Sequence, residues 1–107
     1  MGNIKTTVSG IKFDSKKESK RWVDLRLLQD AGIISDLRRQ VPFVLVGPVV
    51  LGGRKKSAIR YFADFTYLEK GELVVEDCKA PHTRTNSTYR LKKHLMMSVF
   101  GIEIRET

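Results

Sequence analysis

The chain of 107 residues has little cysteine, little histidine and no long apolar run. Its one cysteine, Cys78, cannot form a disulfide within the chain, and one cysteine with two histidines is too small a set for a zinc site. The longest apolar runs, such as residues 41–46, are far shorter than the roughly 20 residues that span a bilayer. The N-terminus also lacks the apolar core of a secretory signal. These absences exclude a disulfide scaffold, a zinc enzyme and a membrane protein, and we expect a soluble, cytoplasmic protein.

Acidic residues are in the minority. Twenty Lys and Arg stand against 12 Asp and Glu, which gives a net charge of +8. Residues 1–53 and 54–107 each carry a net +4, so the basic character belongs to the whole fold rather than to a tail. A polyanion is therefore the expected partner, and DNA or RNA is favoured over a cationic domain that binds neither.

Hydrophobic periodicity predicts one α/β domain over residues 1–107, with a mixed central sheet flanked by helices. We expect the order helix, three strands, helix, strand, over residues 15–31, 33–46, 59–68, 73–79, 87–100 and 102–105. The intervening segments are predicted as a polar N-terminal segment with at most one short strand (residues 1–12), turns with a basic loop (47–58) and an exposed mobile loop (80–88).

The first helix has a clear start signal. Ser15 can cap its N-terminus, Glu18 stands at the capping-box position, and Phe13 can act as a hydrophobic staple. We expect this helix to bury Trp22, Leu25 and Leu28, flanked by Val23 and Leu27, and the second helix to bury Leu91, Leu95 and Val99.

A hairpin between the second and third strands brings two acids together. If Lys70 and Gly71 form a two-residue turn, Asp64 lies directly opposite Asp77 on the same face. Two carboxylates facing each other between apolar residues repel, and a divalent cation such as Mg²⁺ would offset that repulsion. The alternative is a surface hairpin whose two aspartates face water.

Two further charged residues extend this cluster. Lys79 follows Asp77 by two residues, so it shares a face with it and can orient a water or stabilise charge on a phosphate. Glu18 lies one turn before Trp22, which aims it at the sheet, but a capping box with Ser15 explains it equally well.

These residues resemble the PD-(D/E)xK nuclease superfamily, and within it a group of small phage-encoded endonucleases related to Holliday-junction resolvases. The resemblance covers about residues 10–104 and departs from the pattern at Ala63, where the family has proline, and at Asp77, where glutamate is commoner. It is carried by the segments Phe13–Glu18, Tyr61–Phe65, Val75–Lys79 and Tyr89–Lys92.

The resemblance implies a restriction-endonuclease-like fold and a metal-dependent DNA endonuclease that hydrolyses phosphodiester bonds in branched or structured phage DNA. It implies Mg²⁺, with Mn²⁺ as a substitute, held by Asp64, Asp77 and the backbone carbonyl of Cys78, with Glu18 completing the acidic cluster and Lys79 positioning the water. A phage-encoded protein would act in the cytoplasm of the host cell. The resemblance is compatible with a homodimer, because a symmetric junction resolvase needs two active sites.

Clusters of basic residues surround these motifs. We expect them to bind flanking phosphates, although each on its own is as compatible with a solvated face. They are Lys16, Lys17, Lys20 and Arg21, then Arg54, Lys55 and Lys56, then Arg90, Lys92 and Lys93. Gln40 is a weaker candidate to line the site, and a purely structural role is favoured for it. The alternatives to a nuclease are a non-catalytic DNA-binding module on a nuclease-like fold and a basic protein-interaction module.

Overall fold

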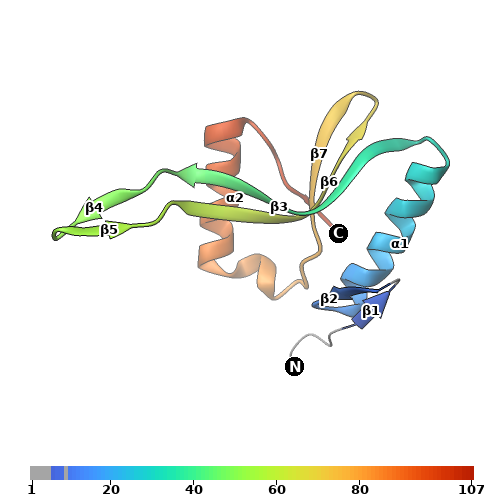
Figure 1. Cartoon of the computed structure of the whole chain (residues 1–107), viewed down its shortest axis with the longest axis horizontal. Coiled ribbons are helices and arrows are strands. Elements are labelled where there is room, and N and C mark those ends of the chain that lie inside the picture. The colour runs from blue at the N-terminus through green and yellow to red at the C-terminus, as the bar shows by residue number, and fades with distance from the viewer. Residues whose placement is uncertain (1–5, 9) are drawn as a thin grey trace.

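A four-stranded mixed sheet in the order β3-β6-β7-β8 lies at the centre of the computed structural model, which describes residues 6–8 and 10–107 (Figure 1). Strands β7 and β8 are parallel, and the other neighbours are antiparallel. Two hairpins, β1-β2 and β4-β5, are separate from this sheet. The elements are β1 (Thr6–Val8), β2 (Ile11–Phe13), α1 (Lys16–Asp30), β3 (Ile34–Val46), β4 (Val49–Leu51), β5 (Arg54–Lys56), β6 (Ile59–Glu69), β7 (Glu72–Asp77), the 3₁₀ turn η1 (Thr83–Thr85), α2 (Ser87–Phe100) and β8 (Arg105–Glu106).

The core elements follow the predicted order of helix, three strands, helix and strand. The chain is thus a small α/β domain with a mixed sheet and two helices, as expected. The N-terminal segment, predicted with at most one short strand, instead holds the two-stranded hairpin β1-β2 in its described part, while residues 1–5 and 9 lie outside the described residues. Within the described ranges, no helix is long and apolar enough to cross a membrane.

Each helix covers a different stretch of the sheet. Helix α1 packs Trp22 and Leu25 against a cluster that includes Phe65, near the end of β6. Helix α2 packs Tyr89 and Met96 against a second cluster near the start of the same strand, which includes Tyr61, Ala63 and Leu45. Residue 64 therefore stands between the two cores, and this position carries Asp64.

The predicted first helix begins as expected. Ser15 is its N-cap, and its Oγ accepts the backbone N–H of Glu18 at 3.2 Å. Trp22 and Leu25 are buried as predicted, but Val23 and Leu27 are 42% and 62% exposed, so the apolar stripe is narrower than predicted.

The second helix presents a different face from the predicted one. Leu91 and Val99 are 58% and 49% exposed, whereas Tyr89 and Met96 are buried and Leu95 packs at the edge of the cluster. The prediction from the most apolar residues gave the wrong helix face, because the sheet contacts α2 on the side that carries the Tyr89 ring. The stretch predicted as a mobile loop, residues 80–88, instead contains η1 and the first two residues of α2.

The hairpin β6-β7 has the predicted register, with Phe65 opposite Glu76. Its two turn residues, Lys70 and Gly71, have φ values of +52° and +78°, which is the geometry of a type I′ turn. The strand ends at Asp77 rather than at the predicted Lys79. Because the turn fixes the register, it also fixes which side chains meet at the far end of the hairpin.

The other side of β7 anchors α1 to the sheet. Glu76 is fully buried and accepts both a 2.5 Å bond from Arg21 Nε and a 3.1 Å bond from its Nη2. The hydroxyls of Tyr67 and Thr107 donate to the same carboxylate at 2.5 and 3.1 Å. Because Arg21 lies on α1, these hydrogen bonds to the Glu76 carboxylate fix the position over the sheet of the helix that carries Glu18.

Candidate metal and phosphodiester site

Asp64 and Asp77 come together at the open end of the β6-β7 hairpin. The Asp64 Oδ2 accepts the backbone N–H of Cys78 at 2.8 Å, which fixes its carboxylate beside the end of β7. Burial raises the pKa of Asp64, and contact with the Asp77 carboxyl raises it further. The two acids are thus close enough to share a proton or a cation.

Asp77 is the more buried of the two, with 1% of its surface exposed. One oxygen, Oδ2, accepts a 2.5 Å bond from the hydroxyl of Tyr61. The other, Oδ1, is buried and has no hydrogen-bond partner among the residues that the structure describes, and its one ion-pair contact there is the Lys79 ammonium at 3.5 Å. A buried carboxylate oxygen that accepts no hydrogen bond costs free energy, so a donor or cation in closer contact with it would stabilise the folded protein.

Lys79 lies just beyond β7 on the side of Asp77. Its Nζ is 3.5 Å from Asp77 Oδ1 and 5.2 Å from the centre of the Tyr89 ring. Its backbone carbonyl accepts hydrogen bonds from Lys17 Nζ at 3.1 Å and from Arg84 Nε at 3.2 Å. The backbone of Lys79 is therefore fixed from two sides, while its side chain remains 31% exposed.

Glu18 has two separate roles in the structure. Its backbone N–H receives the Ser15 cap, while its carboxylate, in a residue only 5% exposed, accepts a 3.2 Å bond from Gln40 Nε2 and lies 3.7 Å from Arg39 Nη2. Burial and the charge of Asp64 raise the pKa of Glu18 to about 6. The cap uses the backbone and leaves the carboxylate directed toward the site.

Gln40, which the sequence ranked as filler, links the acids. Its Nε2 lies 3.2 Å from Glu18 Oε1 and 3.4 Å from Asp64 Oδ1. The residue has a φ of +50° within β3, a conformation that costs a non-glycine residue about 1 kcal/mol or more. The bridge depends on this strained backbone and on residues from three elements, so no local sequence signal identifies it.

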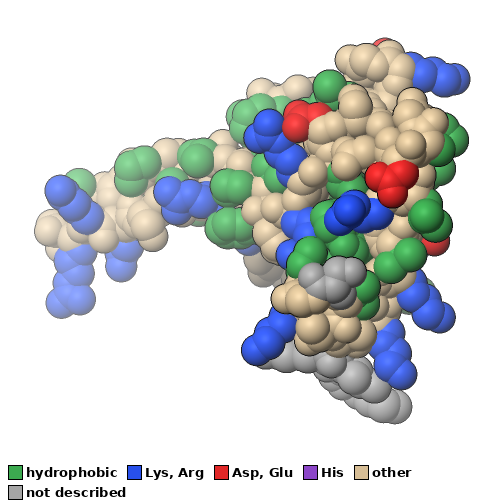
Figure 2. Space-filling view, turned by 45° about the vertical axis from the view of Figure 1, so that its right-hand side comes forward, with side chains coloured by type: hydrophobic (Ala, Val, Ile, Leu, Met, Phe, Trp, Pro, Cys, Tyr) green, Lys and Arg blue, Asp and Glu red, His purple; other side chains and the backbone are tan. Residues whose placement is uncertain are grey.

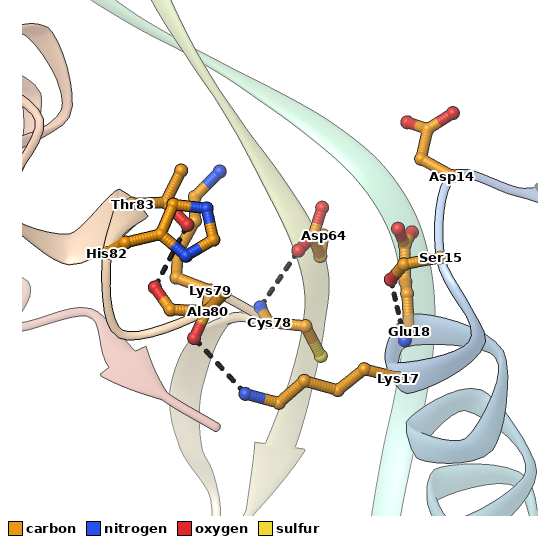
Figure 3. A pocket seen from close by; sticks show the side chains of 10 residues that line it. All are labelled: Asp14, Ser15, Lys17, Glu18, Asp64, Cys78, Lys79, Ala80, His82 and Thr83. Atoms are coloured by element: carbon orange, nitrogen blue, oxygen red, sulfur yellow. Dashed lines mark hydrogen bonds between the residues drawn. The ribbon is translucent and has the colours of Figure 1, made fainter. Parts of the chain in front are cut away.

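A cavity of about 300 Å³ opens over these groups (Figure 3). Asp64 lies between Glu18 on α1 and the segment that carries Lys79, and Lys17 reaches across to the carbonyl of Lys79. His82 lines the same cavity. The cavity thus exposes Glu18, Asp64 and Lys79 to a common space, while buried Asp77 lies behind its lining residues Cys78 and Lys79 in the chain.

The arrangement suits a cation held by two acids better than a larger acidic cluster. Among the residues that the structure describes, no group of three or more His, Cys, Asp or Glu side chains is placed to hold one metal ion. Glu18 is joined to Asp64 through the amide of Gln40. Mg²⁺ commonly takes one or two carboxylates and keeps several waters, so the pair of Asp64 and Asp77, whose Oδ1 accepts no hydrogen bond from the described residues, fits it.

The predicted phosphate-binding residues have different surroundings. Lys17 borders the cavity, and Lys92 borders a neighbouring one of about 370 Å³ that shares Lys79 with it. Arg21 and Lys93 are engaged elsewhere, with Glu76 at 2.5 Å and with Glu106 at 3.3 Å. The remaining members are all exposed and are Lys16, Lys20, Arg54, Lys55, Lys56 and Arg90.

The chain belongs to a family of proteins of unknown function, DUF1064, whose model matches residues 2–105. Comparison with curated proteins and with solved structures finds no match. The geometry of the site therefore carries the functional argument.

Proposed function

We propose that the protein is a metal-dependent DNA endonuclease of the PD-(D/E)xK type, with Mg²⁺ as its cofactor and a restriction-endonuclease-like core. The observation that carries this proposal is the pair Asp64 and Asp77, with a buried Asp77 oxygen that accepts no hydrogen bond from the described residues and the Lys79 ammonium 3.5 Å from that oxygen. Asp64 and Lys79 line one cavity with Asp77 buried beside them, and a divalent cation held by the two carboxylates would make this a suitable set for phosphodiester hydrolysis.

The residues of the site have different roles in the proposed reaction. Mg²⁺ held by Asp64 and Asp77 would supply a Lewis acid that polarises a phosphate oxygen and acidifies a bound water. Lys79 directs its ammonium at the attacking water or at the charge that develops on the phosphate, in a place fixed by Lys17 and Arg84. Glu18 acts through Gln40, which keeps the Asp64 carboxylate in position.

DNA as substrate is supported by charge. The net charge of +8 favours a polyanion, and Lys17 and Lys92 border the two cavities that meet at Lys79. The proposal for branched or structured DNA, such as a four-way junction, comes from the resemblance to resolvases.

A cleavage panel tests the proposal. Linear, nicked, flapped and four-way-junction DNA would be incubated with the wild-type protein, with and without Mg²⁺, beside the variants Lys79→Ala and Asp77→Asn. Lys70→Asn is the matched control, because it removes a lysine in the hairpin turn and asparagine tolerates the positive φ there. We expect Mg²⁺-dependent cleavage by the wild type and the control only. Equal cleavage by Lys79→Ala would contradict the proposal.

The alternative is a non-catalytic DNA-binding module on the same fold. One observation favours it, namely the lack of a metal-ligating group of three or more residues within the described ranges. Against it, a pure binder gains nothing from a buried and a half-buried acid that repel each other. DNA binding with strong salt dependence but no cleavage in the panel would support the alternative.

A further inference from the structure

A two-stranded ribbon projects from the sheet and belongs to neither core. This ribbon arm, residues 47–58, consists of β4, β5 and the residues that join them to β3 and β6. Every residue from 47 to 57 is exposed. Figure 1 shows the arm continuing β3 and β6 away from both helices, along the longest axis of a molecule that measures 51 × 37 × 26 Å.

The arm is basic without any acidic counterpart. Between residues 37 and 63 the chain contains no Asp or Glu, while Arg54, Lys55, Lys56 and Arg60 lie in or directly beside the arm. Figure 2 shows Lys and Arg side chains extending from the tip of the projecting ribbon. Because these charges have no acidic neighbours along the chain, the arm presents a positive field to an anionic partner.

Each rung of the arm pairs one aliphatic with one cationic side chain. Val49 faces Lys56, Val50 faces Lys55 and Leu51 faces Arg54. The three aliphatic residues are 47%, 64% and 61% exposed. A surface that sets cationic groups beside apolar ones matches a DNA groove, where phosphates flank base edges and thymine methyl groups.

The tip is slim. Gly52 and Gly53 have φ values of +56° and +74°, which makes a tight turn without side chains. The major groove of B-DNA, about 12 Å wide, admits a two-stranded ribbon of this kind.

We propose that the ribbon arm lies in the major groove of duplex DNA next to the site, so that cleavage requires a double-stranded flank on one side of the cut. This inference rests on the proposed function, which supplies DNA as the substrate. A second copy of the chain is the less suitable occupant, because two arms paired with each other would bring rows of Lys and Arg together.

The length of the arm sets the length of the flank. Lys55 precedes Asp64 by nine residues, which at about 3.3 Å per residue in a strand spans at most about 30 Å. At about 3.4 Å per base pair, this distance corresponds to about 9 bp, close to one turn of the helix. The duplex must therefore extend for about one turn beyond the cut.

The test compares affinity with duplex length. Fluorescent linear duplexes of about 8 to about 24 bp, and a four-way junction with arms of matching lengths, would be titrated without Mg²⁺. In one variant, residues 47–58 are replaced by Asn-Gly, which can close the hairpin because Val46 already pairs with Ile59. A second variant carries R54A, K55A and K56A. The matched control carries R26Q, R38Q and K70N, three cations outside the proposed interface.

We expect wild-type affinity to rise at least about tenfold as the duplex passes one turn, and both arm variants to lose this rise. The triple arm variant should also reduce the slope of log affinity against log salt by about 2 to 3, while the control keeps the length dependence. An unchanged length dependence in both arm variants, or no binding of duplex by the wild type, would overturn the proposal.

Two further readouts separate this inference from the proposed function. Sedimentation of the same proteins tests whether the arm instead joins two copies of the chain. If the wild type is a dimer and the arm variants are monomers with unchanged DNA affinity, the proposal is also overturned. A cleavage assay with Mg²⁺ completes the test. If binding depends on the ribbon arm but no cleavage occurs, the proposed nuclease function is wrong and the proposed role of the arm is supported. If cleavage depends on Lys79 but is unchanged in the arm variants, the nuclease function is supported and the role of the arm is wrong.

Discussion

At the site, side chains from four elements hold one another, whereas residues 47–57 of the ribbon arm are all exposed. Glu18 on α1, Gln40 on β3, Asp64 on β6 and Asp77 on β7 are joined through hydrogen bonds and shared burial. In the arm, β4 and β5 pair with each other. The comparison separates two demands on a small protein. Chemistry needs groups fixed against the core, and contact with a large anion needs charge presented far from it.

The largest effect on the cleavage rate is expected from the substitution of Lys79. Replacement by Ala should reduce cleavage by about 10²- to 10³-fold, because the charge that develops on the phosphate loses its ammonium partner. DNA affinity should change by less than about twofold, since one lysine among 20 basic residues contributes little to phosphate neutralisation. Single-turnover cleavage and equilibrium binding would measure the two effects. A parallel loss of affinity and cleavage would place Lys79 with the binding residues.

Glu18→Gln should lower cleavage by about tenfold to a hundredfold, the usual range for a group that orients a metal ligand. The helix cap survives because Ser15 Oγ accepts the backbone N–H of residue 18. Thermal unfolding should therefore shift little, and it gives the control. A variant that is fully active but clearly less stable would return Glu18 to a purely structural role.

A smaller effect is expected when one substitution at the site and one in the ribbon arm are compared by the free energy of unfolding. Tyr61→Phe should reduce the free energy of unfolding by about 1–3 kcal/mol, because buried Asp77 loses the donor at its Oδ2. Leu51→Ser in the arm should change it by less than about 0.5 kcal/mol, since the residue is 61% exposed. Denaturant unfolding of both proteins measures the contrast. Equal losses would show that the arm packs against something in solution.

The pH dependence of stability gives a further small effect. The pKa values of Glu18, about 6, and of Asp64 are raised in the folded protein, so the folded state binds protons more tightly than the unfolded chain. Without metal, these groups should make the protein more stable at about pH 5 than at about pH 8, by on the order of 1–2 kcal/mol. Glu18→Gln should flatten this dependence in thermal unfolding curves, and a rise in stability toward pH 8 would contradict the assignment.

The sequence predicted the parts of the site that local rules control. A two-residue turn at Lys70 and Gly71 fixes the hairpin register, and the register places Asp64 against Asp77. The same holds for the start of α1, which depends on the cap at Ser15. In each case a few neighbouring residues decide the geometry.

The features that were missed depend on contacts between distant elements. Gln40 bridges residues 22 and 24 positions away, and it does so from a strained conformation that no pattern announces. The buried face of α2 follows from where the sheet meets Tyr89 rather than from its most apolar residues. The basic segment at residues 54–56 was predicted as a loop, because its pairing with Val49–Leu51 has no apolar alternation to reveal it.

The central claim is that Asp64 and Asp77 hold one divalent cation. Calorimetric titration of the metal-free protein with Mn²⁺ and Mg²⁺, at a pH above 7 and without DNA, tests it most directly. The matched variants are Asp64→Asn and Asp77→Asn, which preserve shape, with Lys70→Asn as the control. We predict one site in the wild type and the control that is lost in both aspartate variants. Undiminished metal binding in both would contradict the account.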